Sequence, residues 1–285
     1  DSGDNLSVPF LGDIPQDSGE KQRGSFVVRE NGRDPVSEAF RMIRSNMNFM
    51  NLGKDEIKVI MVTSSNPHAG KTFVSTNLAM TFATTGKKVV IMDLDLRRRT
   101  FSKQMGHGGD TNGVSSYLSG STELQAIIRK SNLSETLDLI YAGIQPPNPS
   151  ELLLSQRMEE LIAELKLHYD YIIIDSTPAM AVADAIITDR LADLSIYVVR
   201  EGLLDRRQLP DIERLYREKK FNNMAIILNG ASSTKRHGYG YGYGYGYGYG
   251  YGYGYGYGLD EEETATKKGF WGKLCEWTRN KFQKK

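Results

Sequence analysis

The sequence predicts an α/β protein with a mostly parallel sheet flanked by helices, because short apolar runs alternate with helical patterns from residue 57 onward. Several of these runs are nearly continuous in Val, Ile and Met, which is typical of strands covered on both faces. The expected strands are 57–63, 88–93, 137–141, 171–175, 195–199 and 224–229. The expected helices between them are 71–85, 150–167, 182–191 and 206–219.

An earlier helix is expected to begin at Asp34, with this residue as N-cap and Pro35 at the first helical position. Apolar residues recur after it at helical spacing and give the helix one buried stripe. These residues are Phe40, Ile43, Met47 and Met50.

The composition is that of a globular protein, with 285 residues of which 39% are hydrophobic and 25% charged. The net charge of +1 does not suggest a nucleic-acid partner. The single cysteine, Cys275, rules out an internal disulfide and fits a reducing cytosol. No run approaches the roughly 18 apolar residues of a membrane span, and no signal peptide is recognised.

The strand expected at 57–63 leads into a phosphate-binding loop and then into a helix, which is the proper context of a P-loop. Backbone N–H groups of such a loop surround phosphate oxygens, and the helix N-terminus adds its positive dipole end. Lys71 is expected to reach the β- and γ-phosphates, and the Thr72 hydroxyl to bind Mg²⁺. Ser65 stands where the usual pattern has its first glycine. The expected ATP-binding residues of the loop are Ser65, Asn66, His68, Ala69, Gly70, Lys71, Thr72 and Phe73.

Acidic residues end two of the expected strands, Asp93 and Asp95 after one and Asp175 after the other. Ligands of open α/β sheets lie beyond the carboxyl ends of the strands, so these carboxylates are expected to converge on the P-loop. A magnesium nucleotide needs oxygen ligands of this kind. Any one aspartate could instead cap the following helix.

A P-loop followed by Asp93-x-Asp95-x-Arg97 and then by Asp175-Ser-Thr-Pro resembles the bacterial tyrosine kinases (BY-kinases) of polysaccharide synthesis, over about residues 7–258. In that family the three motifs are called Walker A, A′ and B, and the resemblance implies a deviant P-loop NTPase fold. It also implies ATP and Mg²⁺ as cofactors, with Lys71, Asp93 and Asp95 as catalytic residues. The implied metal-binding residues are Thr72, Asp93 and Asp175.

Two further residues are matched to such proteins. Asn229, at the end of the last strand, resembles an asparagine that contacts adenine in related deviant P-loop proteins. Asp184 falls in a stretch that the family also carries, although a place at a helix N-terminus explains it equally well.

Glu38, Arg41 and Arg44 lie along one side of the first helix, where they could form no more than a solvated flank. The pattern Glu-x-x-Arg-x-x-Arg also resembles the BY-kinase motif through which neighbouring subunits form a ring. Residues 9–15 resemble the segment that follows the second membrane span of single-chain members. This likeness implies a membrane-anchored parent protein, with the kinase domain on the cytoplasmic face of the bacterial inner membrane.

Residues 238–258 alternate strictly between Gly and Tyr, and such a repeat cannot bury a core. It could be an adhesive segment or a spacer. The resemblance implies instead that it is the tyrosine cluster that neighbouring subunits phosphorylate in trans. The expected phosphoacceptors are Tyr239, Tyr241, Tyr243, Tyr245, Tyr247, Tyr249, Tyr251, Tyr253, Tyr255 and Tyr257.

The predicted organisation has four parts: a lead-in (1–33), a P-loop tyrosine kinase domain (34–236), the Gly-Tyr repeat (237–258) and an acidic, then basic, amphipathic tail (259–285). The basic end carries Trp and Phe at helical spacing and indicates either membrane-surface binding or docking on a protein. Expected partners are a second copy of the chain, a phosphatase and polysaccharide-assembly proteins. The alternatives are a regulatory positioning ATPase without kinase activity, and a structural module whose Gly-Tyr segment is adhesive.

Overall fold

Eight strands form one sheet in the computed structural model, which describes residues 7–16, 26–50, 56–180 and 183–232. The Gly-Tyr repeat and the tail at 259–285 lie outside the described residues. The strands are β1 (Phe10–Pro15), β2 (Val59–Ser64), β3 (Val89–Asp93), β4 (Ile128–Lys130), β5 (Leu137–Ile140), β6 (Tyr171–Asp175), β7 (Leu194–Arg200) and β8 (Met224–Ala231).

The sheet has the order β1-β8-β7-β2-β6-β3-β5-β4, and every neighbouring pair is parallel except β4 with β5. The predicted mostly parallel α/β sheet is confirmed. Parallel strands end on the same edge of a sheet, so the carboxyl ends of β2, β3, β6, β7 and β8 meet at one edge.

Two strands were not predicted. β1 reads FLGDIP, which carries no alternating apolar pattern, yet it pairs in parallel with β8 and buries Leu11 and Ile14. β4 has three residues and pairs antiparallel with β5 at the other edge. Part of the lead-in therefore belongs to the sheet.

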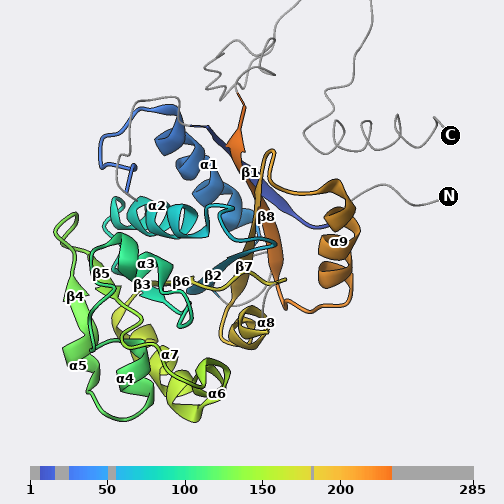
Figure 1. The fold of residues 1–285 in the computed structure, drawn as a ribbon. Coiled ribbons are helices and arrows are strands. Elements are labelled where there is room, and N and C mark those ends of the chain that lie inside the picture. The colour runs from blue at the N-terminus through green and yellow to red at the C-terminus, as the bar shows by residue number, and fades with distance from the viewer. Residues whose placement is uncertain (1–6, 17–25, 51–55, 181–182, 233–285) are drawn as a thin grey trace, which may run out of the picture. The chain divides into compact units, whose positions relative to one another are not determined.

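Helices cover both faces of the sheet. They are α1 (Pro35–Phe49), α2 (Lys71–Ala83), α3 (Thr100–Gln104), α4 (Val114–Leu118), α5 (Leu124–Ile127), α6 (Pro149–Leu154), α7 (Gln156–His168), α8 (Asp184–Asp189) and α9 (Leu209–Arg217), with a one-turn 3₁₀ helix, η1 (Arg206–Gln208). α1 and α2 lie on one face, and α7 and α8 on the opposite one (Figure 1). None of the helices among the described residues is long and apolar enough to span a membrane.

The predicted start of α1 is confirmed, because the Asp34 carboxylate accepts the Ser37 N–H at 3.0 Å and Pro35 follows at the first helical position. Phe40, Ile43 and Met47 of the expected stripe are buried. The Phe40 ring packs edge-on against Phe73 of α2, with centroids 6.1 Å apart. α1 is thereby fixed beside the helix that follows the P-loop.

The helices expected at 71–85 and 182–191 are found as α2 and α8, whereas the other two predicted helices are divided in the structure. The expected helix 150–167 is two helices, because Ser155 between them is extended (ψ 153°) and its hydroxyl accepts the Met158 N–H as an N-cap. The expected helix 206–219 begins as the 3₁₀ turn η1 and becomes α-helical only at Leu209. Pro210 lies in the first turn of α9, where its missing N–H costs no hydrogen bond.

Candidate functional site

The P-loop joins β2 to α2 at the edge where the parallel strands end. Gly70 precedes α2 with φ 95°, in the left-handed region, and a Cβ there would lie 2.1 Å from the Asn229 amide nitrogen. Only glycine fits this position. The Asn229 amide in turn donates to the Ala69 carbonyl at 2.9 Å. The residue that is predicted to contact adenine therefore also stabilises the P-loop.

The start of α2 faces the end of β6. The Thr72 hydroxyl donates to Asp175 Oδ2 at 2.7 Å, and the Ser75 hydroxyl donates to Asp175 Oδ1 at 3.0 Å. Both are buried, and Asp175 is only 1% exposed. The carboxylate thereby fixes the hydroxyl that the sequence assigns to the metal.

Asp93 and Asp175 lie side by side, because they are paired in register on the adjacent strands β3 and β6. Asp93 Oδ2 accepts the N–H and the hydroxyl of Ser102 at 3.0 and 2.6 Å, and Oδ1 accepts the Asp95 N–H at 3.1 Å. Asp95 Oδ1 accepts the Arg98 N–H at 2.9 Å. The turn after β3 therefore holds both A′ carboxylates in fixed positions.

Charge in this cluster is unbalanced. Burial raises the pKa of Asp93, Asp95 and Asp175, and the charge of Asp175 further raises that of Asp93. Burial also lowers the pKa of Lys71, although Asp175 and Asp95 act against this shift. Three carboxylates thus face one partly buried lysine, and a divalent cation would relieve their repulsion.

The A′ arginine is fixed by Asp184. Arg97 Nε donates to Asp184 Oδ2 at 2.7 Å, and the Ser150 hydroxyl donates to Asp184 Oδ1 at 2.6 Å. Asp184 is buried, with its side chain 2% exposed, whereas Arg97 is 40% exposed. Asp184 thus joins the A′ turn to α6 and α8, a role that its place at a helix start did not reveal.

The residues present fit a magnesium nucleotide. The candidate ligands are a threonine hydroxyl and carboxylates, and Mg²⁺ prefers a few such oxygens with waters and phosphates rather than an all-protein cage. No group of three or more His, Cys, Asp or Glu side chains in the described part of the chain could hold a metal alone. The buried hydroxyls of Ser176 and Thr177, directly after Asp175, have no hydrogen-bond partner within that part. Such groups suit a ligand or water at this edge.

The structure brings the predicted P-loop residues together with Asp93, Asp95, Asp175 and Asn229. The Phe73 ring packs against α1, so only its backbone N–H is available to a phosphate. Ser75 and Ser102, which orient the carboxylates, were not predicted, since a serine near an acidic residue carries no distinct sequence pattern.

The three residues of the predicted assembly motif lie apart from this site, on α1. Arg41 contacts Glu38 and also the Gly32 carbonyl, and Arg44 donates to the Thr81 carbonyl of α2 at 3.1 Å. Both arginines therefore already support their own chain.

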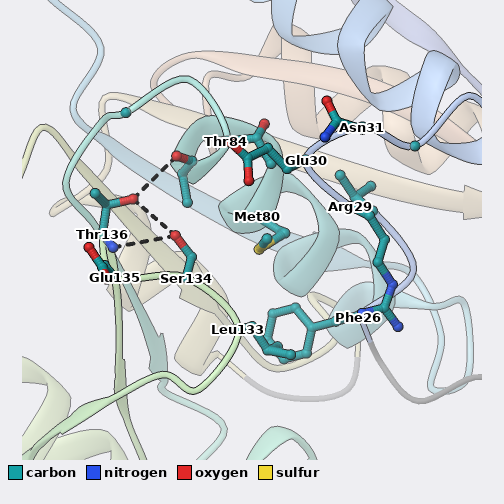
Figure 2. Close-up of a pocket in the computed structure, with 14 residues that line it drawn as sticks. Phe26, Arg29, Glu30, Asn31, Met80, Thr84, Leu133, Ser134, Glu135 and Thr136 are labelled. Carbon is teal, nitrogen blue, oxygen red and sulfur yellow. Dashed lines mark hydrogen bonds between the residues drawn. The ribbon is translucent and has the colours of Figure 1, made fainter.

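A cavity of about 880 Å³ lies at the other end of α2. Phe26, Met80 and Leu133 line its apolar side, and Glu30 and Glu135 its polar side (Figure 2). The 13 residues of α2 separate it from the P-loop by about 20 Å. The cavity is thus separate from the carboxylate cluster.

Comparison with known proteins agrees with this geometry. Residues 57–199, half of the chain, match the family model described as an AAA domain. The fold and the loop define a P-loop NTPase domain. Tyrosine-protein kinase YwqD of Bacillus subtilis is 34% identical over 226 residues, which are 79% of this chain and 94% of that protein. The chain belongs to the family of bacterial tyrosine-protein kinases.

Other relatives are longer or are isolated domains. Tyrosine-protein kinase etk of Escherichia coli is 36% identical over 72% of this chain, which spans only 28% of that protein. The crystallised kinase domain of the Escherichia coli tyrosine kinase ETK has a TM-score of 0.70 and 32% identity, over 83% of this chain and 95% of that domain. The predicted family and fold are confirmed.

Asp175→Asn tests the metal site. Mg²⁺ with ADP at a hundredfold excess over Kd should raise the melting temperature of the wild type by about 5–10 °C and that of the variant much less. Thermal melting measures both, with Asp13→Asn, at an exposed aspartate of β1, as control. Equal shifts in wild type and Asp175→Asn would remove Asp175 from the site.

The same variant tests the charge imbalance in EDTA. A carboxylate with a raised pKa stabilises the fold fully only below its ordinary pKa of about 4, and loses that contribution as the pH rises. Wild-type stability should therefore fall relative to Asp175→Asn between about pH 4 and pH 6, from the ordinary pKa of this carboxyl to the raised pKa of Asp175 of about 6. A difference that does not change with pH would contradict the imbalance.

Proposed function

We propose that this chain is an ATP-dependent protein-tyrosine autokinase that phosphorylates its C-terminal tyrosine cluster. The observation that carries the proposal is the convergence of Lys71, Asp93 and Asp175 at one sheet edge, in a chain that also holds ten tail tyrosines. A positioning ATPase would need the phosphate site but has no use for the tyrosines.

In the proposed reaction the tyrosine oxygen attacks the γ-phosphorus in line, the bond from phosphorus to the ADP oxygen breaks, and the phenolic proton passes to a carboxylate. Lys71 and the N–H groups at the start of α2 bind the phosphates and stabilise the charge that develops. Thr72 and Asp175 would hold Mg²⁺, which when bound neutralises phosphate charge. Positioning and electrostatics supply most of the acceleration.

The two A′ aspartates receive different roles. Both oxygens of Asp93 accept hydrogen bonds from protein donors, which suits an indirect contact to the metal through water. Asp95 is held by the backbone of its turn and faces the charges of Lys71 and Arg98. We assign to Asp95 the orientation of the incoming tyrosine and the acceptance of its proton.

Phosphorylation in trans within a ring is part of the proposal. A Gly-rich segment of about 20 residues extends roughly 25 Å on average and up to about 70 Å when stretched, so it can reach a neighbouring domain of this size. Each phosphotyrosine adds about −1.5 to −2 charges, so extensive phosphorylation would favour release of the subunits. Glu38, Arg41 and Arg44 on α1 are the proposed contact surface.

The family relationship also supports a proposal for the cellular setting. We place the kinase at the cytoplasmic face of the bacterial inner membrane, as a domain of a membrane-anchored protein or complex. Its proposed role is to regulate the synthesis or export of capsular polysaccharide or exopolysaccharide, with a phosphatase resetting the tail.

Purified protein with Mg²⁺ and ATP should gain several phosphates on Tyr239–Tyr257, as measured by mass spectrometry of tail peptides. Lys71→Met should reduce this at least 100-fold, because the phosphates lose the lysine cation. Lys87→Met, at an exposed lysine beyond the other end of α2, is the control. Wild-type protein that hydrolyses ATP and leaves every tyrosine unmodified would favour the positioning ATPase.

Glu38→Ala should shift the unphosphorylated protein toward smaller species in analytical ultracentrifugation. It is a cleaner test than an arginine substitution, because Arg41 and Arg44 also hold backbone carbonyls of their own chain. Glu164→Ala is the matched control, since Glu164 is likewise 49% exposed and has a partner on its own helix. If the two variants sediment identically, Glu38, Arg41 and Arg44 form only a solvated side of α1 and not a contact between subunits.

A further inference from the structure

Three residues of the P-loop, Ser65, His68 and Ala69, are hydrogen-bonded to side chains of β7 and β8. Ser65 Oγ and Tyr197 OH lie 2.8 Å apart, Arg200 donates to the His68 carbonyl at 3.2 Å, and Asn229 donates to the Ala69 carbonyl at 2.9 Å. Tyr197 and Arg200 belong to β7 and Asn229 to β8. Because β7 and β8 are paired in the sheet, the three side chains reach the P-loop from neighbouring strands.

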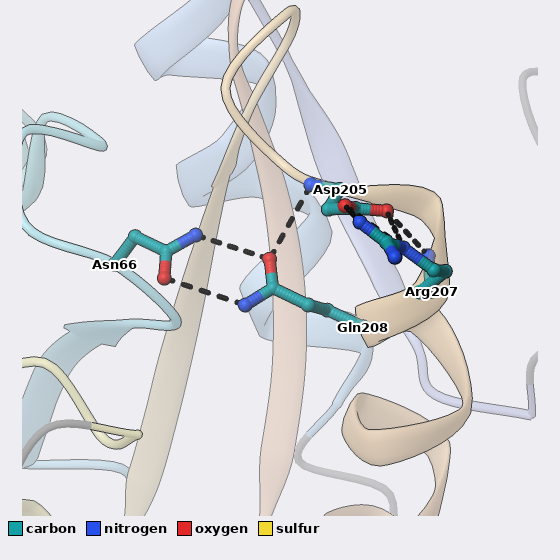
Figure 3. Close-up of polar contacts among 4 residues, drawn as sticks. All are labelled: Asn66, Asp205, Arg207 and Gln208. Atoms are coloured by element: carbon teal, nitrogen blue, oxygen red, sulfur yellow. Dashed lines mark hydrogen bonds and ion pairs between the residues drawn. The ribbon is translucent and has the colours of Figure 1, made fainter.

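A fourth contact comes from outside the sheet. Asn66 Nδ2 donates to Gln208 Oε1 at 3.1 Å, and Gln208 Nε2 donates back to Asn66 Oδ1 at 3.4 Å (Figure 3). The two residues are 142 positions apart in the sequence. Gln208 lies at the end of the 3₁₀ turn η1, so this pair joins the P-loop to the segment between β7 and α9.

Asp205 and Arg207 stabilise the 3₁₀ turn that carries Gln208. The Asp205 carboxylate accepts the Arg207 N–H at 2.9 Å and pairs with the Arg207 guanidinium at 2.6 Å. Gln208 N–H donates to the Asp205 carbonyl at 2.9 Å. Asp205 N–H donates to Gln208 Oε1 at 3.3 Å (Figure 3). These contacts therefore hold the Gln208 amide in the orientation that pairs with Asn66.

We propose that Gln208 is a positioning residue for nucleotide binding, which acts through its reciprocal amide pair with Asn66. The inference rests on the proposed nucleotide site. A P-loop binds phosphates only when its successive N–H groups converge, and any disorder must be removed on binding at a cost in affinity. Because the amide pair already orders the loop at Asn66 before the nucleotide binds, this part of the loop does not have to be ordered on binding. Gln208 itself does not touch the reacting atoms.

The test is the affinity for a fluorescent ADP analogue with Mg²⁺, together with KM and kcat for tail phosphorylation. Gln208→Ala should weaken analogue binding about 3- to 10-fold, the effect expected for two neutral hydrogen bonds. It should raise the KM for ATP similarly and leave kcat within about twofold. Gln156→Ala, at an exposed glutamine that starts α7, is the matched control and should bind as the wild type does.

An exchange of the two side chains separates positioning from a merely structural role. Asn66→Gln and Gln208→Asn should each weaken binding, because one amide becomes too long or too short for its partner. The double variant restores the combined length and should recover most of the affinity. Gln208→Glu keeps the acceptor for Asn66 but sets a carboxylate oxygen against Asn66 Oδ1 and adds negative charge beside the phosphate loop, so its affinity should fall at least as far as that of Gln208→Ala.

Three results would overturn the proposal. These are unchanged or tighter analogue binding in Gln208→Ala, strictly additive losses in the exchanged double variant, and a fall in kcat with KM unchanged. Because analogue binding does not need an acceptor tyrosine, the proposal remains testable even if the wild type fails to phosphorylate its tail. That failure would count against the kinase function alone.

Discussion

Three buried carboxylates around one partly buried lysine are the constraint on which the site depends. Asp93 and Asp175 are neighbours because β3 and β6 run parallel in register, so the topology of the sheet itself sets their spacing. Burial makes their charges costly, as the raised pKa values of both groups indicate. A bound cation would relieve this cost, which is the physical reason to relate the site to magnesium nucleotides.

The local features of the site could be predicted from the sequence. The P-loop lies on contiguous residues, and Asp93 and Asp175 each end an apolar strand, so no long-range information was needed. The side chains that orient these groups were not predictable. Ser75 and Ser102 carry no distinctive pattern, and the Asn66–Gln208 pair joins residues 142 positions apart. Such pairings depend on tertiary structure, which a pattern of apolar spacing does not encode.

The fold, like the site, could be predicted only in part from the sequence. The interior strands were predicted because burial on both faces leaves continuous apolar runs. β1 was missed because an edge strand with Gly12, Asp13 and Pro15 has the composition of a loop, and its pairing with β8 alone makes it a strand. The break at Ser155 was missed because the apolar spacing continues across it. Only the extended backbone and the serine cap separate α6 from α7.

α1 has to be considered both as part of the core and as a surface. Its apolar side packs on α2 through Phe40 and Phe73, while Arg44 contacts the carboxyl end of α2. A contact between subunits on this helix would therefore act on the helix that begins at Lys71. This connection offers a physical route from assembly to the phosphate site.

Transfer of phosphate from this cluster to the tail tyrosines of another subunit is a proposal that can be tested directly. The most direct measurement mixes two proteins with Mg²⁺ and ATP: a Lys71→Met protein with its ten tail tyrosines, and a protein with Lys71 intact and those tyrosines changed to Phe. Mass spectrometry of the tail peptides then locates the phosphate. The account predicts phosphotyrosine on the Lys71→Met chain. An unmodified Lys71→Met tail, under conditions in which the wild type labels itself, would contradict transfer between subunits.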